Sequence, residues 1–406
     1  MLPLEGIKIV DLTQMLMGPA ATGTLADMGA EVIKVEPRYG DLARGAALSK
    51  LGLRGPHLAV IEAMFLAVNR NKKSIAIDLT KEKGKDILVK LVKEADVLVH
   101  NFRAGAAKKL GIDYQSVANH NERIIYASGS GFGLKGPKRD NPAMDLLGQA
   151  VSGIMKQSGA PDGPPVPIGP TVIDQAAGML LAYGIMIALF ARERTGIGQE
   201  VDVSLLGTAL ALQSWNMNFH LLTGNAPPRL SRAQGIVGGL SMIFKAEDDW
   251  LALAGVRDQR WPAFCRVLGI EHLKDDPSFA TANDRNANRD ELVAVLDQVF
   301  LTKPRSEWLK LLEEADQIVA PVNSYDEVAT DPQVLANEYI CEIADPKRGL
   351  TKLTGIPVKL SKTPGKIRSL SPELGEHTND ILLSLGYSWD EIARLTSEEV
   401  VGFIGI

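Results

Sequence analysis

The sequence has only two cysteines, Cys265 and Cys341, which stand far apart in a chain of 406 residues. This number and spacing exclude a disulfide framework and the paired-cysteine spacing of a zinc site. The six histidines are scattered and form no HxxxH pair, so we expect no metal site. A chain without a disulfide framework is typical of a reducing compartment, and we expect a cytoplasmic protein.

Several common enzyme motifs are also missing. The first strand-like run is followed by residues 11–19, which contain no GxGxxG, so a dinucleotide site of the usual kind is not expected. The chain likewise has no GxxxxGK[ST] loop, no GxSxG elbow and no HExxH pair. These absences exclude the P-loop enzymes, the α/β-hydrolases and the HExxH metalloproteases.

Long apolar runs and a signal sequence are absent too. The most apolar stretch, Ala176 to Phe190, is shorter than the ~20 residues that span a bilayer, so we expect a buried helix there. The first residues, Met1 to Glu5, lack the basic and apolar regions of a signal peptide. The net charge of -5 gives no bulk reason to bind nucleic acid or an anionic membrane. An anionic ligand would therefore need a local basic pocket.

Strand-like and helix-like segments alternate through the first half of the chain. Such a rhythm predicts an α/β fold with a parallel, Rossmann-like sheet and helices on both faces. The expected strands are residues 6–12, 31–36, 96–100, 123–127, 200–204 and 251–254, and the expected helices are 19–28, 81–94, 145–155, 172–194 and 379–385. From about Leu353 we expect strand and loop.

The length suggests two domains, because a single core seldom grows beyond about 250–300 residues. The composition shifts to Gly, Pro and Arg between Leu222 and Gly239, and we place a domain boundary there. The predicted division is a large domain over 1–224, a smaller α+β domain over 225–330 and a return segment over 331–406.

Asp174 opens an otherwise apolar helix and invites two interpretations. An acidic residue in the first turn commonly serves only to pair with the helix dipole. The same carboxylate, at the edge of an apolar pocket, could instead attack a thioester as a covalent nucleophile. The residue pattern alone leaves both open.

Other polar and flexible positions leave similar choices. Basic residues in the first part of the chain are either solvated surface or a cradle for a phosphorylated ligand, because Arg and Lys pair well with phosphate. Gly235, Gly238 and Gly239 form either a linker or a flap over a site. The basic set is Arg38, Arg44, Lys72, Lys73, Arg103, Lys108 and Lys109, and three later arginines, Arg229, Arg232 and Arg257, could pair with a substrate carboxylate.

Segments along essentially the whole chain resemble the class III CoA-transferases, the family of formyl-CoA transferase and carnitine CoA-transferase. Several independent motifs stand in the family's order. They are residues 4–13, Gly18-Pro19, 25–37, 69–79, 95–103, 141–145 and 374–378. The resemblance implies an enzyme that moves coenzyme A between carboxylic acids, with acyl-CoA as substrate and no permanently bound cofactor.

The resemblance also implies roles for individual residues. Asp174 stands at the position of the family's nucleophile, which would carry an aspartyl-CoA thioester. Gly238 and Gly239 stand where some members have a glycine flap. The implied CoA contacts are Met17, Arg38, Lys72, Asn101, Phe102, Arg103, Lys109 and Asp145.

In this family each protomer forms an open ring, and two rings interlock as a dimer. The large domain is built from both chain ends and the small domain from the middle. The resemblance therefore implies a homodimer, or a heteromer with a paralogous subunit. Succinyl-CoA is a candidate donor, and a substituted dicarboxylate such as benzylsuccinate is a candidate acceptor.

Two alternative functions remain. An acyl-CoA racemase shares this fold, but the resembling racemases carry a histidine where this chain has Met144. Racemisation needs proton transfer on both faces of a carbon, so the missing histidine argues against it. The second alternative is an inactive subunit of a heteromeric transferase, which should lack the nucleophile at Asp174.

Overall fold

The computed structural model describes residues 1–45, 55, 57–229, 232–233, 240–346 and 348–402. Gly235, Gly238 and Gly239 lie outside the described residues. The chain divides into two compact units. Unit 1 comprises residues 1–152, 169–213 and 332–406, and unit 2 comprises residues 153–168 and 214–331.

Unit 1 is built on a seven-stranded sheet with the order β12-β3-β2-β1-β4-β5-β6. All the pairings are parallel except that of β12 with β3. The order 3-2-1-4-5-6 is that of a Rossmann sheet, so the expectation of a parallel α/β fold is confirmed. The strands are β1 (Lys8–Asp11), β2 (Glu31–Glu36), β3 (Lys72–Ile77), β4 (Val97–His100), β5 (Ile125–Ser130), β6 (Gln199–Ser204) and β12 (Val401–Gly402).

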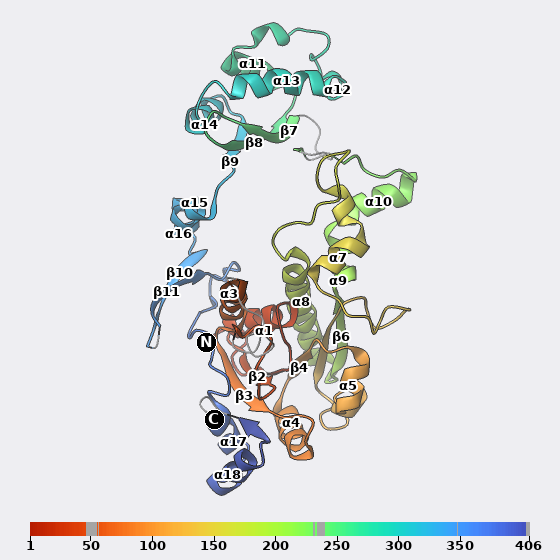
Figure 1. The fold of residues 1–406 in the computed structure, drawn as a ribbon, viewed down its shortest axis with the longest axis vertical. Helices are drawn as coiled ribbons and strands as arrows, with labels where there is room; N and C mark the ends of the chain where they lie inside the picture. Colours follow the sequence, from red (N-terminus) through yellow and green to blue (C-terminus); the bar gives the residue numbers. More distant parts are fainter. Residues whose placement is uncertain (46–54, 56, 230–231, 234–239, 347, 403–406) are drawn as a thin grey trace. The chain divides into compact units, whose positions relative to one another are not determined.

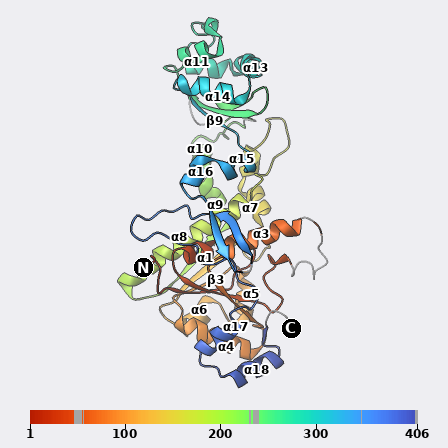
Figure 2. The ribbon, with the colours of Figure 1, turned by 90° about the vertical axis from the view of Figure 1, so that its left-hand side faces the viewer.

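Helices cover both faces of this sheet (Figures 1 and 2). Alternate residues of a strand point to opposite faces, so each face has its own apolar core. On one face Ile9, Val97 and Val99 pack against α1 (Met17–Asp27) and α8 (Val172–Thr195). On the other, Val10 and Leu98 pack against α4 (Glu82–Glu94), α17 (Thr378–Ser384) and α18 (Trp389–Ser397).

The helix pair α1 and α8 approaches closely because a glycine stands at the crossing. A Cβ atom on Gly178 would lie 2.8 Å from the Met17 carbonyl oxygen and 2.9 Å from the Ala20 Cβ. Helix α8 ends where Gly196 adopts a left-handed conformation with φ 74°, a conformation that glycine takes without steric cost. The start of α8 is therefore held tightly against the start of α1.

The remaining elements of unit 1 are short. A two-stranded antiparallel hairpin, β10 (Ile340–Asp345) and β11 (Gly349–Thr354), precedes the C-terminal helices. The other helices are α3 (His57–Asn69), α5 (Ala104–Leu110), α6 (Tyr114–Ala118), α7 (Asp145–Ser152), α9 (Leu205–Leu212) and α16 (Pro332–Ala336).

Unit 2 has its own core around a three-stranded antiparallel sheet. Stacked aromatic rings of Phe244 and Phe300 fill its centre, with Trp308 at the edge of the Phe300 ring. The strands are β7 (Leu240–Lys245), β8 (Trp250–Val256) and β9 (Ile318–Pro321). The helices are η1 (Ile154–Gln157), α10 (Ser214–Thr223), α11 (Trp261–Leu268), η2 (Glu271–Leu273), α12 (Ala282–Ala287), α13 (Arg289–Phe300), α14 (Arg305–Glu314) and α15 (Tyr325–Thr330).

The division of the chain and the segment after Leu353 differ from what the sequence predicts. Residues 153–168 and α10 cluster with unit 2, whereas the predicted large domain ran to residue 224. The predicted division into domains stays a prediction. The strand expected from Leu353 ends at Thr354, and residues 355–377 form no helix or strand. Side chains hold that segment instead, since the Asn71 Oδ1 accepts the N–H groups of Arg368 at 2.6 Å and Ser369 at 3.1 Å.

Candidate active site

The carboxyl edge of the parallel sheet is where this fold places ligands. In open α/β sheets, ligands bind outside the carboxyl ends of the strands where the strand order reverses, which here is between β1 and β4. Helix α8 leads through Gly196 into β6, which is parallel to the other strands. The N-terminus of α8, with Asp174 in its first turn, therefore lies at the same carboxyl edge.

Asp174 is held in place through its backbone by a second carboxylate. The buried Asp145, at the start of α7, accepts the N–H groups of Ile173 at 2.8 Å and Asp174 at 3.0 Å with its Oδ1. Its Oδ2 accepts the Gln149 side-chain amide at 2.6 Å. The first N–H groups of a helix have no partner within the helix, and Asp145 satisfies two of them. The cap of α8 thus comes from another helix rather than from its own N-cap residue, Thr171.

The Asp174 carboxylate itself is half-buried and has no ion-pair partner among the described residues. Burial, with a further contribution from the negative charge of Asp145, raises the pKa of Asp174 from 3.8 to about 6. A carboxylate withdrawn from water and unpaired with a cation keeps more of its basicity than one at the surface. At neutral pH most molecules would still carry the ionised, nucleophilic form.

Met17 and Asn101, two of the predicted CoA contacts, lie together at this edge. Both approach Gly129 near the end of β5: a Cβ there would meet the Met17 Sδ at 3.1 Å and the Asn101 Cβ at 3.5 Å. Met17 also packs against Ile173 and Ala177, on either side of Asp174 in sequence. The structure therefore brings Met17, Asn101, Asp145 and Asp174 to one end of the sheet.

The Asn101 side chain joins the two loops at the switch point. Its Oδ1 accepts the Gln14 N–H at 2.9 Å, and its Nδ2 donates to the Gln14 carbonyl at 2.7 Å. The next residue, Phe102, donates its N–H to Nδ1 of the buried His100 at 3.2 Å, and the two rings stack. Burial lowers the pKa of His100 to about 4, so His100 is neutral and keeps this nitrogen free to accept.

Lys72 and Arg38 have partners within the protein. The Lys72 ammonium lies in the interior and donates to Asp11 at 3.0 Å, to the Pro19 carbonyl at 3.0 Å and to Asn69 at 2.8 Å. These three bonds use all its protons and give Lys72 a structural role, while its contact with CoA stays a prediction. Arg38 forms an ion pair with Glu399 at 3.3 Å, beside the last strand.

Arg103 and Lys109 are exposed at the two ends of α5, and neither has an ion-pair partner among the described residues. They remain available to a solvent-borne anion. In unit 2, Arg229 donates to the carbonyls of residues 159, 163 and 164, and Arg232 pairs with Asp297 at 2.9 Å. Of the three arginines predicted for a substrate carboxylate, only the exposed Arg257 has no side-chain partner within the described part of the chain. The predicted flap residues Gly238 and Gly239 lie outside the described residues.

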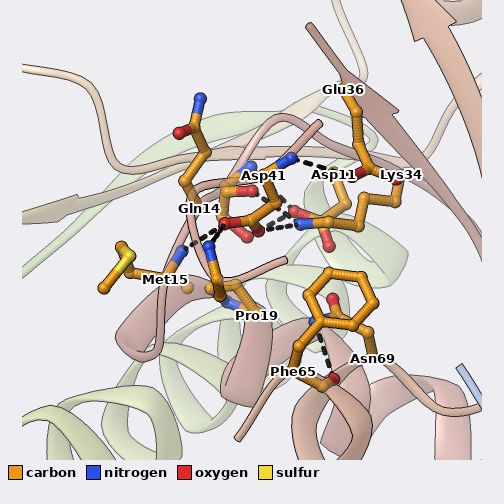
Figure 3. Close-up of polar contacts among 12 residues, drawn as sticks. Asp11, Gln14, Met15, Pro19, Lys34, Glu36, Asp41, Phe65 and Asn69 are labelled. Atoms are coloured by element: carbon orange, nitrogen blue, oxygen red, sulfur yellow. Dashed lines mark hydrogen bonds and ion pairs between the residues drawn. The ribbon is translucent and has the colours of Figure 1, made fainter. Parts of the chain in front are cut away.

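A group of buried charges beneath the β1–α1 loop was not predicted from the sequence (Figure 3). Asp11, Lys34 and Asp41 are fully buried, and Lys34 pairs with Asp41 at 2.8 Å. Burial alone would raise the pKa of Asp11, but the charges of Lys72 and Lys34, together with hydrogen bonds from Thr13 and Thr22, more than offset it and lower the pKa to about 2. The only signal in the sequence was the charged pair of alternate positions, Lys34 and Glu36, within an apolar strand.

The described residues contain no group of three His, Cys, Asp or Glu side chains that could hold a metal ion. The side chain of Met144, where a racemase would need a histidine, is largely exposed. The site thus presents two carboxylates, one engaged with backbone N–H groups and one unpaired, next to an apolar wall.

The chain matches the family model for CoA-transferase family III over residues 4–378. It is 36% identical to the succinyl-CoA:glutarate CoA-transferase of Mus musculus, covering 99% of this chain and 91% of that protein. It is 37% identical to the acetyl-CoA:oxalate CoA-transferase of Acetobacter aceti, covering 88% of this chain and 89% of that protein. The crystal structure of a CAIB/BAIF family protein from Brucella suis superimposes with a TM-score of 0.84 at 32% identity, covering 95% and 99% of the two chains.

A match over nearly the whole length, together with a fold and relatives of the same kind, leaves one assignment. The chain belongs to CoA-transferase family III and is a CoA-transferase.

Proposed function

We propose that this enzyme transfers coenzyme A between carboxylic acids through an aspartyl-CoA thioester on Asp174. The observation that carries the proposal is the Asp174 carboxylate itself. It lies in the first turn of α8 at the carboxyl edge of the sheet, has no cation partner among the described residues, and has a pKa raised by burial and by Asp145 to about 6.

The reaction needs no net proton transfer. The Asp174 Oδ attacks the thioester carbon of the donor and the C–S bond breaks. CoA thiolate departs, and a mixed anhydride of Asp174 and the donor acid is formed. The thiolate then attacks the Asp174 Cγ, which releases the donor acid and forms the aspartyl-CoA thioester. The acceptor carboxylate attacks that Cγ and expels CoA thiolate again. The thiolate finally attacks the acceptor's acyl carbon, which regenerates the Asp174 carboxylate.

Carboxylates are weak nucleophiles, so the protein must supply orientation and exclusion of water. Asp145 contributes orientation, because it fixes the backbone of Ile173 and Asp174 by two hydrogen bonds. The apolar packing of Met17 against the first turns of α8 contributes a dry wall. We place the CoA moiety along the β1–β4 switch point, over Asn101 and Phe102, with Arg103 and Lys109 facing its phosphates.

For substrates we propose succinyl-CoA as donor and a dicarboxylate as acceptor. The names of the two relatives described above include glutarate and oxalate, which are both dicarboxylates. No permanently bound cofactor is part of the proposal.

Incubation with succinyl-CoA, followed by trapping with hydroxylamine and peptide mapping by mass spectrometry, tests the mechanism directly. We expect a modified peptide with the hydroxamate at Asp174, and none when succinyl-CoA is left out or when Asp174 is replaced by Asn. Absence of any adduct with succinyl-CoA and with a panel of other acyl-CoAs would overturn the covalent mechanism.

We also propose a homodimer, in the interlocked form that the family resemblance implies. An apolar stripe on α8 is exposed at Met179, Tyr183 and Phe190, each more than 60% accessible. Length and composition alone would let α8 cross a membrane, but nearly half of its most apolar window is buried inside the protein. A second copy of the chain would cover the stripe. We also place the enzyme in the cytoplasm. Light scattering should give twice the chain mass, and Phe190→Asp should shift it toward the monomer.

A further inference from the structure

Some hydrogen bonds of the loop between β1 and α1 reach side chains from other elements of unit 1. The Met15 N–H donates to the Asp41 Oδ1 at 3.0 Å, and the Thr13 carbonyl accepts from the Lys34 ammonium at 2.8 Å (Figure 3). Met15 has φ 68°, a left-handed conformation that is uncommon for a residue with a side chain. Such a conformation persists only where its surroundings impose it.

Asp41 is in a position to impose that conformation. Its side chain is fully buried and pairs with Lys34, whose side chain is also fully buried, at 2.8 Å. The Asp41 Oδ1 that receives the Met15 N–H also accepts the Ala43 N–H at 2.9 Å. The carboxylate is therefore fixed on both oxygens, and its Oδ1 is a rigid anchor for the bend at Met15.

The bend determines where α1 begins. Two residues later, Met17 packs against Ile173 and Ala177 of α8, and its carbonyl approaches Gly178 closely. The first turn of α8 carries Asp174, so a shift of the loop would change the wall beside the Asp174 carboxylate. Removal of the Asp41 carboxyl group should therefore change the surroundings of Asp174 indirectly. That carboxyl group contacts Met15, Ala43 and Lys34, none of which belongs to α8.

We propose that Asp41 is a positioning residue for acyl transfer, holding the β1–α1 loop in the bend that sets Met17 against the first turn of α8. The proposal rests on the proposed function in one respect only: Asp174 is taken as the group that attacks the acyl-CoA. Asp41 itself would take no part in bond making or breaking.

Three variants separate positioning from stability. Asp41→Ala removes the anchor. Asp41→Asn keeps an oxygen that can accept the Met15 N–H while removing the charge. Asp27→Asn is the matched control, because Asp27 is also a buried carboxylate of unit 1 in an ion pair, with Arg70 at 2.7 Å, but lies at the far end of α1.

Two measurements are made on each full-length variant. The first is the single-turnover rate at which succinyl-CoA labels Asp174, set against the Kd for CoA. We expect Asp41→Ala to label about 10- to 100-fold more slowly, the range that a misplacement of about 1 Å produces, with a Kd within about threefold of wild type. Asp41→Asn and Asp27→Asn should label within about threefold of wild type.

The second measurement is hydrogen exchange in the peptide covering residues 13–17, which needs no catalytic activity. We expect this peptide to exchange faster in Asp41→Ala and to stay protected in Asp41→Asn and Asp27→Asn. A wild-type labelling rate in Asp41→Ala, or equal slowing in Asp41→Asn and Asp41→Ala, would overturn the positioning role. If wild type itself is not labelled, the proposed function fails, while hydrogen exchange still decides whether Asp41 holds the loop.

Discussion

Asp174 and Asp11 are both carboxylates withdrawn from water at the carboxyl edge of one sheet. They differ in the charged and polar groups that surround them. Asp11 contacts the Lys72 ammonium and two hydroxyls, those of Thr13 and Thr22, and the nearby charge of Lys34 also acts on it, so its pKa falls to about 2 despite complete burial. Among the described residues Asp174 has no cation partner, a second carboxylate is nearby, and its pKa rises to about 6. Cations make the first group a permanent anion with little basicity. Without such a partner the second keeps more basicity, as the proposed nucleophile requires.

The comparison also separates two uses of buried charge. The charges around Asp11 form ion pairs with one another and hydrogen bonds to the backbone. Removal of one charge would leave its partner buried and unpaired. Burial and the charge of Asp145 raise the free energy of the ionised Asp174 carboxylate, and the proposed acylation would remove that charge. The proposed nucleophile, in the first turn of α8, and a structural ion cluster, at the end of β1, thus lie at the same edge of the sheet and differ above all in their partners.

The largest expected effect follows from removing the proposed nucleophile. Asp174→Asn should lower the transfer rate by at least about 10³-fold, because the carboxyl oxygen proposed to form the covalent bond is lost. The Kd for CoA, measured by calorimetry, should stay close to that of wild type, since the group is not a proposed CoA contact. Transfer at more than about a tenth of the wild-type rate would contradict the assignment.

Breaking the structural cluster should cost stability instead. Lys72→Met leaves the buried Asp11 without its closest cation, and we expect the free energy of unfolding to fall by about 3–5 kcal/mol. The neighbouring Lys73→Met is the matched control, because the Lys73–Glu31 pair is exposed at 48% and 41% and should contribute at most about 1 kcal/mol. Urea denaturation measures both. Equal losses in the two variants would mean that the buried cluster has no special structural weight.

Ionisation of Asp174 and of Asp11 should also affect stability in opposite directions, because the pKa of Asp174 is raised and that of Asp11 is lowered. The folded-state pKa of Asp174 is raised above 3.8, so its favourable contribution is complete below pH 3.8 and is lost as the pH rises through about 6. At pH 8 the ionised group then destabilises the fold, and Asp174→Asn should be more stable than wild type by about 1–3 kcal/mol. Denaturation at pH 8 and at pH 4 tests this, because the difference should shrink at pH 4. A variant less stable than wild type at pH 8 would show that Asp174 is not strained.

Much of the sheet could be predicted from the sequence, but the cluster could not. Runs of Val and Ile marked β2, yet the alternation that places Val32 on the α1 face also places Lys34 and Glu36 there, where a charged residue is not expected. Their partners come from separate turns, so only the folded chain shows that these charges are paired. Resemblance to a family predicted a catalytic role for Asp174, whereas its cap from Asp145, 29 residues earlier, depends on how α7 meets α8.

The finest test of the comparison changes the partner of Asp174 and keeps the nucleophile. Asp145→Asn retains an oxygen for the N–H groups of Ile173 and Asp174 but removes the negative charge that helps to raise the pKa of Asp174. Burial is the larger cause of that rise, so the pKa of Asp174 should fall but stay above 3.8. The labelling rate depends on the ionised form, so its decline below about pH 6 in wild type should move to lower pH in the variant. Because a less basic carboxylate is a poorer nucleophile, the plateau rate should also drop severalfold. An unchanged pH profile would mean that burial alone sets the pKa of Asp174 and that the second carboxylate acts only as a cap for α8.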